Sequence, residues 1–205
     1  KDSWESTWHP RHPVNCGIGG DRTQHLLGRM DDGLLDALAA RGLDQRTLVV
    51  FVSDNGGEWL SRNDPLSSRK DTVWEGGIRV PAIIRWPGRI EPGRVSDQVG
   101  ITMDLTASVL AATATTVPPE VKLEGINLLP ILEGRAPETP RTLFWRTAGS
   151  RQRAVRSGDW KLVVDTGSTF VFDLRTDIGE RHDLARQRQD IARRLRPLIT
   201  RWEND

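Results

Sequence analysis

An aspartate and an asparagine stand side by side directly after an apolar segment of the chain. Residues 47–52 are β-branched or apolar without alternation, which is typical of a strand covered on both faces, as in a parallel sheet. Asp54 and Asn55 follow its carboxyl end, where open α/β sheets bind ligands. A carboxylate and an amide oxygen suit a hard cation such as Ca²⁺ or Mg²⁺, so the pair predicts a site for a cation of this kind. Because Asn-Gly is also a strong turn signal, a simple turn at Asn55 and Gly56 is the competing interpretation.

A lysine in the polar segment between two predicted strands is the second residue that could take part in chemistry. Lys70 is one of four lysines in a chain with 25 arginines. A flexible ammonium group at this position would reach an anion held over the strand ends, and Arg69 and Arg79 would add positive potential. An ordinary solvated lysine is the alternative interpretation.

Two glycines stand between a glutamate and an arginine shortly before the second predicted strand. Gly76 and Gly77 permit close approach of neighbouring backbone. Glu75 and Arg79 are spaced to pair with each other and brace the loop. We therefore interpret this segment as structural rather than catalytic.

Other side chains with chemical capability are scattered along the sequence. Trp59, Trp74 and Trp86 could line an apolar wall for an organic group, with packing in the core as the alternative. His9 and His12 lie in an irregular segment and are candidates for ligands or acids, although histidines in surface loops are common. A single cysteine, Cys16, excludes both an internal disulfide and a zinc site built from several cysteines.

The composition of the chain excludes several classes of partner. Its 205 residues include 29 Lys and Arg against 28 Asp and Glu, so the formal net charge of +1 gives no reason to expect nucleic acid or an anionic membrane. No apolar run approaches the roughly 18 residues that span a bilayer, so we expect no membrane partner. The sequence opens with Lys1 rather than Met and reads as the middle of a domain, which predicts a fragment of a longer protein.

The first region of the chain contains the elements that must position these residues. Apolar residues at intervals of three or four predict an amphipathic helix at about 23–41. A second buried strand is predicted over 80–86 and a short helix over 104–112. The stretch between the two strands is too polar and too broken for a core element, so it is predicted to be a loop.

The second region has the texture of a small antiparallel sheet. Short strands separated by turns that contain glycine are expected at 142–146, 153–156, 161–164 and 170–173. Apolar residues at helical spacing from Ile191 to Trp202 predict a terminal helix that covers this sheet and bends near Pro197. We therefore expect one domain over 1–135 and a small subdomain over 136–205.

Residues 48–57 and 70–81 together form the most specific pattern in the chain. The first contains Asp-Asn-Gly-Gly after the apolar strand, and the second runs from Lys70 through Trp-Glu-Gly-Gly-Ile-Arg into Val-Pro. This pattern closely resembles the type I sulfatases, the arylsulfatase-like branch of the alkaline phosphatase superfamily. The resemblance covers about 23–203 and continues through residues 103–106, 125–132, 143–145, 154–162, 172–180 and 183–185.

The resemblance implies a fold, an activity and a set of site residues. The fold would be α/β, the C-terminal part of a sulfatase-like mixed sheet with flanking helices, followed by a small antiparallel sheet with a terminal helix. The activity would be that of a sulfuric ester hydrolase, acting on a small-molecule or carbohydrate sulfate ester. Asp54 and Asn55 would supply oxygen ligands to an active-site calcium, and Lys70 would contact the sulfate.

The sequence also departs from the pattern of the family. Family members use a formylglycine made from Cys or Ser, with Pro two residues later and Arg four residues later, whereas Ile18 and Gly20 follow Cys16 at those positions. We therefore expect the formylglycine nucleophile and two further acidic metal ligands in the missing N-terminal half of the same protein, and no turnover by the isolated chain. Arg69 and Asp71 stand where glycines commonly flank the family lysine.

Two other functions stay open at this point. One is a phosphodiesterase or phosphonate hydrolase of the same superfamily; zinc-dependent members generally place His beside the aspartate, whereas Asn55 favours a single hard cation. The other is a non-catalytic remnant or binding module, for which weak calcium affinity and an exposed apolar patch would be the signs.

Overall fold

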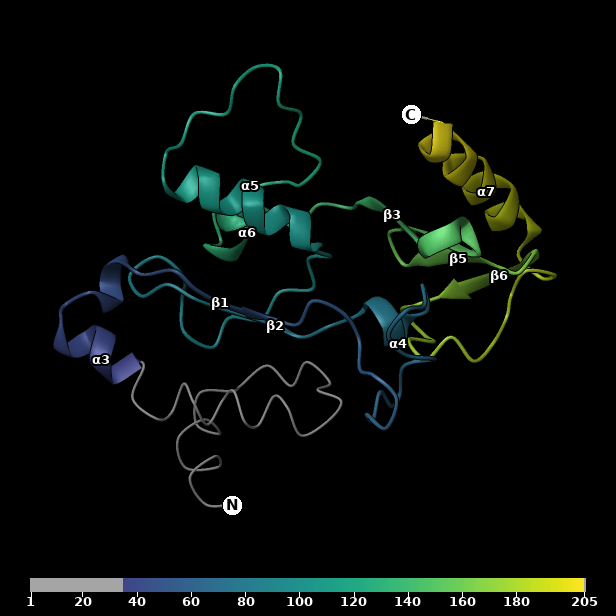
Figure 1. Cartoon of the computed structure of the whole chain (residues 1–205), viewed down its shortest axis with the longest axis horizontal. Helices are drawn as coiled ribbons and strands as arrows, with labels where there is room; N and C mark the ends of the chain where they lie inside the picture. The colour runs from purple at the N-terminus through teal and green to yellow at the C-terminus, as the bar shows by residue number, and fades with distance from the viewer. Residues whose placement is uncertain (1–34, 205) are drawn as a thin grey trace. The chain divides into compact units, whose positions relative to one another are not determined.

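The computed structural model describes residues 35–204 (Figure 1). Most of the helix predicted at 23–41 lies outside this range, which retains α3 (Leu35–Ala40). His9, His12 and Cys16 also lie outside the described residues.

The chain divides into two compact units. Of the described residues, the first unit takes those up to Phe51 and 82–139, and the second takes 52–81 and 140–204. The segment that carries Asp54, Asn55 and Lys70 therefore groups with the small C-terminal sheet. The division into 1–135 and 136–205 stays a prediction.

The first unit contains a two-stranded sheet and short helices. Strand β1 (Val49–Val52) pairs with β2 (Ala82–Arg85), and the 3₁₀ helix η3 (Asp44–Arg46) precedes β1. The expectation that both strands are covered on both faces is wrong for this chain, because their side chains are half-buried or exposed. Within the described residues each of the two strands has only the other as a sheet partner, which leaves one edge of each strand unpaired.

Helix α5 (Thr102–Ala112) confirms the predicted short helix and begins two residues earlier. The buried Asp104 carboxylate accepts hydrogen bonds from the backbone N–H groups of Ile101 and Ile126, both at 2.8 Å, and so caps the helix and fastens the following connection. One more helix of the first unit, α6 (Leu129–Leu132), was not predicted; Pro130 lies in its first turn, where a missing N–H costs nothing.

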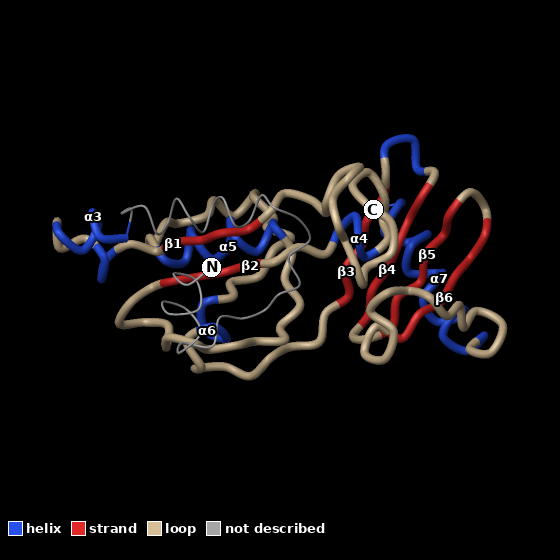
Figure 2. Tube along the Cα trace, turned by 90° about the horizontal axis from the view of Figure 1, so that it is seen from below, coloured by secondary structure: helices blue, strands red, loops and turns tan. Residues whose placement is uncertain are grey.

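The second unit is built on a four-stranded antiparallel sheet (Figure 2). Its strands are β3 (Thr142–Arg146), β4 (Gln152–Ser157), β5 (Trp160–Asp165) and β6 (Ser168–Asp173), hydrogen-bonded in chain order. The register pairs Val155 with Leu162 and Leu162 with Val171. This strand order confirms the predicted meander. The sequence could predict it because glycine turns and short apolar runs are local signals.

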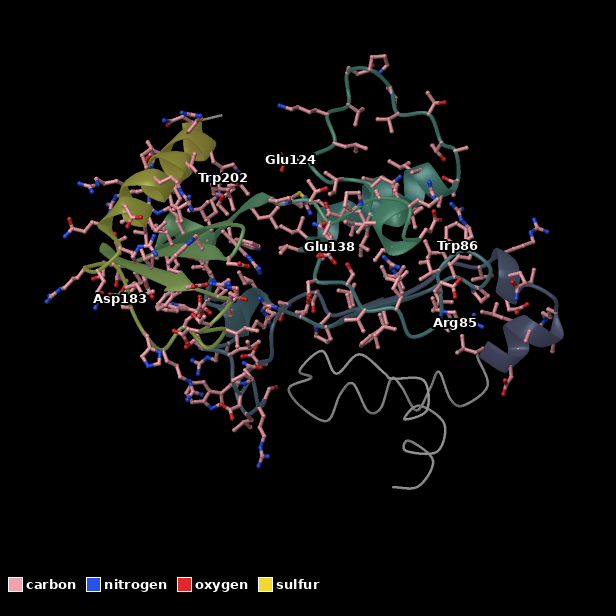
Figure 3. The ribbon with its side chains drawn as sticks, turned by 180° about the vertical axis from the view of Figure 1, so that it is seen from behind. Arg85, Trp86, Glu124, Glu138, Asp183 and Trp202 are labelled. Atoms are coloured by element: carbon pink, nitrogen blue, oxygen red, sulfur yellow. The ribbon has the colours of Figure 1, made fainter. Side chains whose placement is uncertain are left out.

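The terminal helix α7 (Gln189–Asn204) covers one face of this sheet, as predicted. Its buried residues Ile191, Leu195 and Ile199 pack against strand residues of that face. Trp202, which is labelled in Figure 3, stacks on Phe144 of β3 with ring centroids 5.2 Å apart.

The opposite face of the sheet packs against the segment between β1 and β2. Val73 is buried there in one apolar cluster with Ala154, Val163, Phe172 and Leu174. Figure 1 shows the short helix α4 (Glu75–Ile78), which follows Val73, on the side of the sheet away from α7. Among the described residues, no helix combines the length and the apolar character that crossing a bilayer requires.

Candidate functional site

Two loops that carry the predicted site residues lie against each other in the second unit. The strand-end loop (residues 53–57) contains Asp54 and Asn55, and the lysine loop (residues 66–74) contains Lys70. The Lys70 backbone N–H donates to the Gly57 carbonyl at 2.9 Å. The Gly56 N–H donates to the carbonyl of Gly77, just after the lysine loop, also at 2.9 Å. The fold thereby brings the aspartate–asparagine pair and the lysine into one region.

Close backbone packing explains the paired glycines of both motifs. A Cβ atom on Gly56 would lie 1.8 Å from the Gly76 carbonyl oxygen, and one on Gly76 would lie 2.3 Å from the carbonyl oxygen of Ser67. Only glycine fits at such distances. Asn55 and Gly56 do not form the tight turn of a hairpin, because β1 pairs with a strand that begins only at Ala82.

Lys70 is held beside a carboxylate that the sequence analysis did not single out. Its Nζ atom lies 3.2 Å from Glu58 Oε2, and both side chains are about half exposed. The hydrogen bond and the charge of Glu58 raise the pKa of Lys70 above its usual value, and the carboxylates of Asp71 and Asp54 add to this effect. The pKa of Glu58 is lowered, first by the hydrogen bond from the Trp59 N–H and then by Lys70. Both groups are therefore charged at neutral pH.

Asp54 and Asn55 fit part of the coordination sphere of a hard cation. Asp54 is exposed and Asn55 is half-buried, and both offer oxygen atoms. Within residues 35–204 no cluster of three or more His, Cys, Asp or Glu side chains is arranged to hold a metal ion. Because Ca²⁺ takes roughly six to eight oxygen ligands, the pair would need further ligands from elsewhere.

A buried network of charges lies behind the lysine loop. Lys161 Nζ lies 2.8 Å from Glu75 Oε1 and 2.7 Å from Glu180 Oε1. The second Glu75 oxygen accepts a hydrogen bond from Arg79 Nε at 2.6 Å, which confirms the predicted Glu75–Arg79 pair. The prediction that this segment is loop throughout is wrong, because Glu75 begins α4 and is buried with its charge compensated by Lys161.

Burial and pairing act in opposite directions on the two carboxylates. For Glu75, burial alone would raise the pKa, but the charges of Lys161 and Arg79 outweigh it, so the pKa lies below the usual value. For Glu180, burial outweighs the attraction of Lys161, so its pKa is raised.

Two of the tryptophans named in the sequence analysis, Trp59 and Trp74, have different surroundings. Trp74 belongs to the core, because its Nε1 donates to Asp165 at 3.1 Å and its ring lies 5.3 Å from that of Phe170. Trp59 is 63% exposed, and the Arg69 guanidinium lies 3.7 Å from its ring centroid. Trp59 and Arg69 line an open hollow of about 690 Å³ beside the lysine loop, together with Glu58, Leu60, Ser61, Asn63, Asp64, Leu66, Ser68 and Thr72.

Comparison with known proteins finds similarity over most of the chain. The family model described as Sulfatase matches residues 24–115, which include both loops. N-acetylgalactosamine-6-sulfatase of Canis lupus familiaris is 37% identical over 134 residues, which cover 62% of this chain and 25% of that protein. Arylsulfatase A of Bos taurus is 34% identical over 176 residues, which cover 80% of this chain and 34% of that protein. The chain thus spans about a quarter to a third of the length of these two relatives.

Solved structures share the fold. One described as Ps i-CgsB in complex with k-i-k-neocarrahexaose has a TM-score of 0.76 and 26% identity, covering 85% of this chain and 40% of that chain. The mixed α/β arrangement with the small antiparallel sheet and terminal helix therefore has a counterpart in a protein of known structure.

Proposed function

Because this chain belongs to the sulfatase family over part of its members' length, we propose that it forms part of an enzyme that hydrolyses sulfate esters. The observation that carries the proposal is the pair of backbone contacts, Gly56 with Gly77 and Lys70 with Gly57, that join the strand-end loop to the lysine loop. These contacts hold a carboxylate, an amide oxygen and a charged ammonium group in the region matched by the family model.

Lys70 would bind an oxygen of the sulfate group. Its charge is secured by Glu58, and its side chain is exposed enough to exchange that partner for an anionic substrate. Negative charge that develops on the sulfate oxygens during cleavage would be stabilised by this ammonium group.

Asp54 and Asn55 would hold a calcium ion through their side-chain oxygens. When bound, such an ion supplies positive charge that polarises the sulfate group. Since the pair provides only part of the usual ligand number, we propose that the remaining ligands come from outside residues 35–204. The formylglycine that serves as nucleophile in the family would come from another segment of the full protein.

A sulfated carbohydrate is the substrate class that the surroundings of Lys70 favour. Trp59 offers an exposed aromatic surface of the kind on which sugar rings stack, and Arg69 next to it offers donors for an anionic group. The similar structure described above was solved in complex with a carbohydrate. A small aryl sulfate is the alternative.

Release of inorganic sulfate by the protein that contains this chain tests the proposal. Lys70→Met should remove most of the activity, and Lys122→Met, at an exposed lysine of the first unit, is the matched control. Faster cleavage of a phosphodiester than of any sulfate ester would instead favour a phosphodiesterase of the same superfamily.

A further inference from the structure

A lysine of the small sheet is wholly buried against the segment that carries the candidate site. Lys161 on β5 has no exposed surface, and its two carboxylate partners are nearly as inaccessible. Removing three charged groups from water is costly, and such groups often stabilise a fold no better than apolar residues of similar volume. A contribution to stability alone is therefore a weak explanation for this network.

The network closes into a ring that fixes residue 75 through both its side chain and its backbone. Lys161 contacts one oxygen of Glu75 at 2.8 Å and one oxygen of Glu180 at 2.7 Å. The other oxygen of Glu180 accepts the backbone N–H of Glu75 at 2.6 Å. The start of α4 is thus attached to β5 and to the turn before α7 at the same time.

The residues that follow Glu75 are those that hold the two site loops together. The Gly76 N–H donates to the Ser67 carbonyl at 2.7 Å, and the Gly77 carbonyl accepts the N–H of Gly56. Ser67 Oγ also donates to the carbonyl of Gly179 at 2.6 Å, one residue before Glu180. A shift of α4 would therefore move the lysine loop and the strand-end loop relative to each other.

The backbone of Glu180 has an unfavourable conformation. Its φ of 51° lies in the left-handed region, which a non-glycine residue adopts at a cost. One oxygen of its carboxylate accepts the Glu75 N–H, and the other forms an ion pair with Lys161. Such a conformation persists where surrounding contacts hold the residue in place, as the contacts with Lys161 and Glu75 do for Glu180.

We propose that Lys161 is a positioning residue of the candidate site: through Glu75 and Glu180 it fixes α4, and thereby sets Asp54 and Asn55 against Lys70. The functional meaning of this role rests on the proposed sulfatase activity. The positioning itself is a property of the described residues of the second unit. The small C-terminal sheet is therefore part of the machinery of the site rather than an appendage.

The test replaces the buried pair with apolar residues while it conserves net charge. Lys161→Met combined with Glu180→Met leaves the Glu75 carboxylate paired with Arg79, and it also removes the acceptor of the Glu75 N–H. Arg153→Met combined with Glu203→Met is the matched control, because this pair joins β4 of the same sheet to α7.

Amide hydrogen exchange and calcium titration are the two readouts. In the Lys161/Glu180 variant, we expect the Gly56 and Lys70 amides to exchange at least about tenfold faster than in the unsubstituted protein, while amides between β4 and β5 are unchanged. The Ca²⁺ concentration that half-saturates the shift of the Asn55 amide signal should rise by a similar factor. The control pair should change neither quantity.

Unchanged exchange at Gly56 and Lys70 in the folded variant, or equal acceleration in the control, would overturn the proposal. If the double variant does not fold, Glu180→Gln serves instead. It keeps an acceptor for the Glu75 N–H and removes the negative charge that Glu180 places beside Lys161. Unchanged exchange at both amides in that variant would equally overturn it. Because exchange needs no turnover, faster exchange in a protein that cleaves no sulfate ester would refute the proposed function and leave the positioning role intact.

Discussion

Lys161 Nζ lies 2.8 Å from Glu75 Oε1 although the two residues are 86 positions apart in the chain, and both side chains are withdrawn from solvent. One belongs to the small sheet and the other begins the helix that follows the lysine loop. The contact therefore links the geometry of the candidate site to a part of the chain with no site residue of its own.

Removal of the Lys161 charge alone should destabilise the protein strongly. Lys161→Met leaves two buried carboxylates without their shared cation, a change that costs about 3–5 kcal/mol. Urea-induced unfolding measures the loss, with the exposed Lys122→Met expected within about 0.5 kcal/mol of the unsubstituted protein. A loss below about 1 kcal/mol for Lys161→Met would show that Lys161 does not neutralise the buried carboxylates of Glu75 and Glu180.

The two carboxylates of the network should give pH dependences of opposite sign. The folded pKa of Glu75 is lowered, so its contribution to stability is present above the ordinary carboxyl pKa and is lost as the pH falls through the folded value. The folded pKa of Glu180 is raised, so its contribution is present below the ordinary value and is lost as the pH rises through the folded one. Arg79, Arg156, Lys161 and Glu180 are the charged groups around Glu75.

Free energies of unfolding between about pH 3 and pH 7 test these signs. The difference between the unsubstituted protein and Glu75→Gln should grow with rising pH, and the difference for Glu180→Gln should shrink. Equal slopes for the two variants would contradict the assignment.

A methyl group at Gly56 should disrupt the contact between the two loops. Because its Cβ would meet the Gly76 carbonyl oxygen at 1.8 Å, Gly56→Ala should cost at least about 2 kcal/mol and expose the Lys70 amide to exchange. Gly100→Ala is the control, since its Cβ would make only ordinary contacts, the nearest at 3.5 Å. Comparable stability of the two variants, measured by thermal unfolding, would mean that the loops do not pack as closely as described.

Trp59 and Arg69 should matter for an extended substrate and not for a small one. Trp59→Ala and Arg69→Gln should each raise the KM for a sulfated oligosaccharide about tenfold, a loss of about 1.4 kcal/mol, and leave the KM for an aryl sulfate unchanged. Arg62→Gln, an exposed arginine of the same segment, is the matched control. An equal effect on both substrates would argue against a carbohydrate subsite in this hollow.

Local signals explain which parts of the fold could be predicted from the sequence. The strands β3 to β6 and helix α7 follow from glycine turns and from apolar spacing such as Ile191, Leu195 and Ile199, which neighbouring residues alone determine. Helix α4 was missed because its buried first residue is a glutamate, and a charged residue is compatible with burial only through a partner that is remote in sequence.

The candidate site also contains some residues that local sequence predicts and others that it does not. Asp54, Asn55 and Lys70 could be named because they stand at a strand end and within a family motif. Glu58 beside Lys70 and Glu180 beside Lys161 could not, since nothing in the local sequence marks which carboxylate a folded loop brings to which cation. The pairing depends on tertiary contacts and emerges only from the structure.

The central claim is that Lys70 and the Asp54–Asn55 pair belong to a sulfate ester hydrolase, and sulfate release tests it most directly. The measurement is kcat/KM for a sulfated carbohydrate with the complete protein that contains this chain, alongside Lys70→Met and the control Lys122→Met. The account predicts sulfate release that falls at least about 100-fold in Lys70→Met and is unchanged in Lys122→Met. Equal activity of Lys70→Met and the unsubstituted protein, or no sulfate release by the unsubstituted protein, would contradict it.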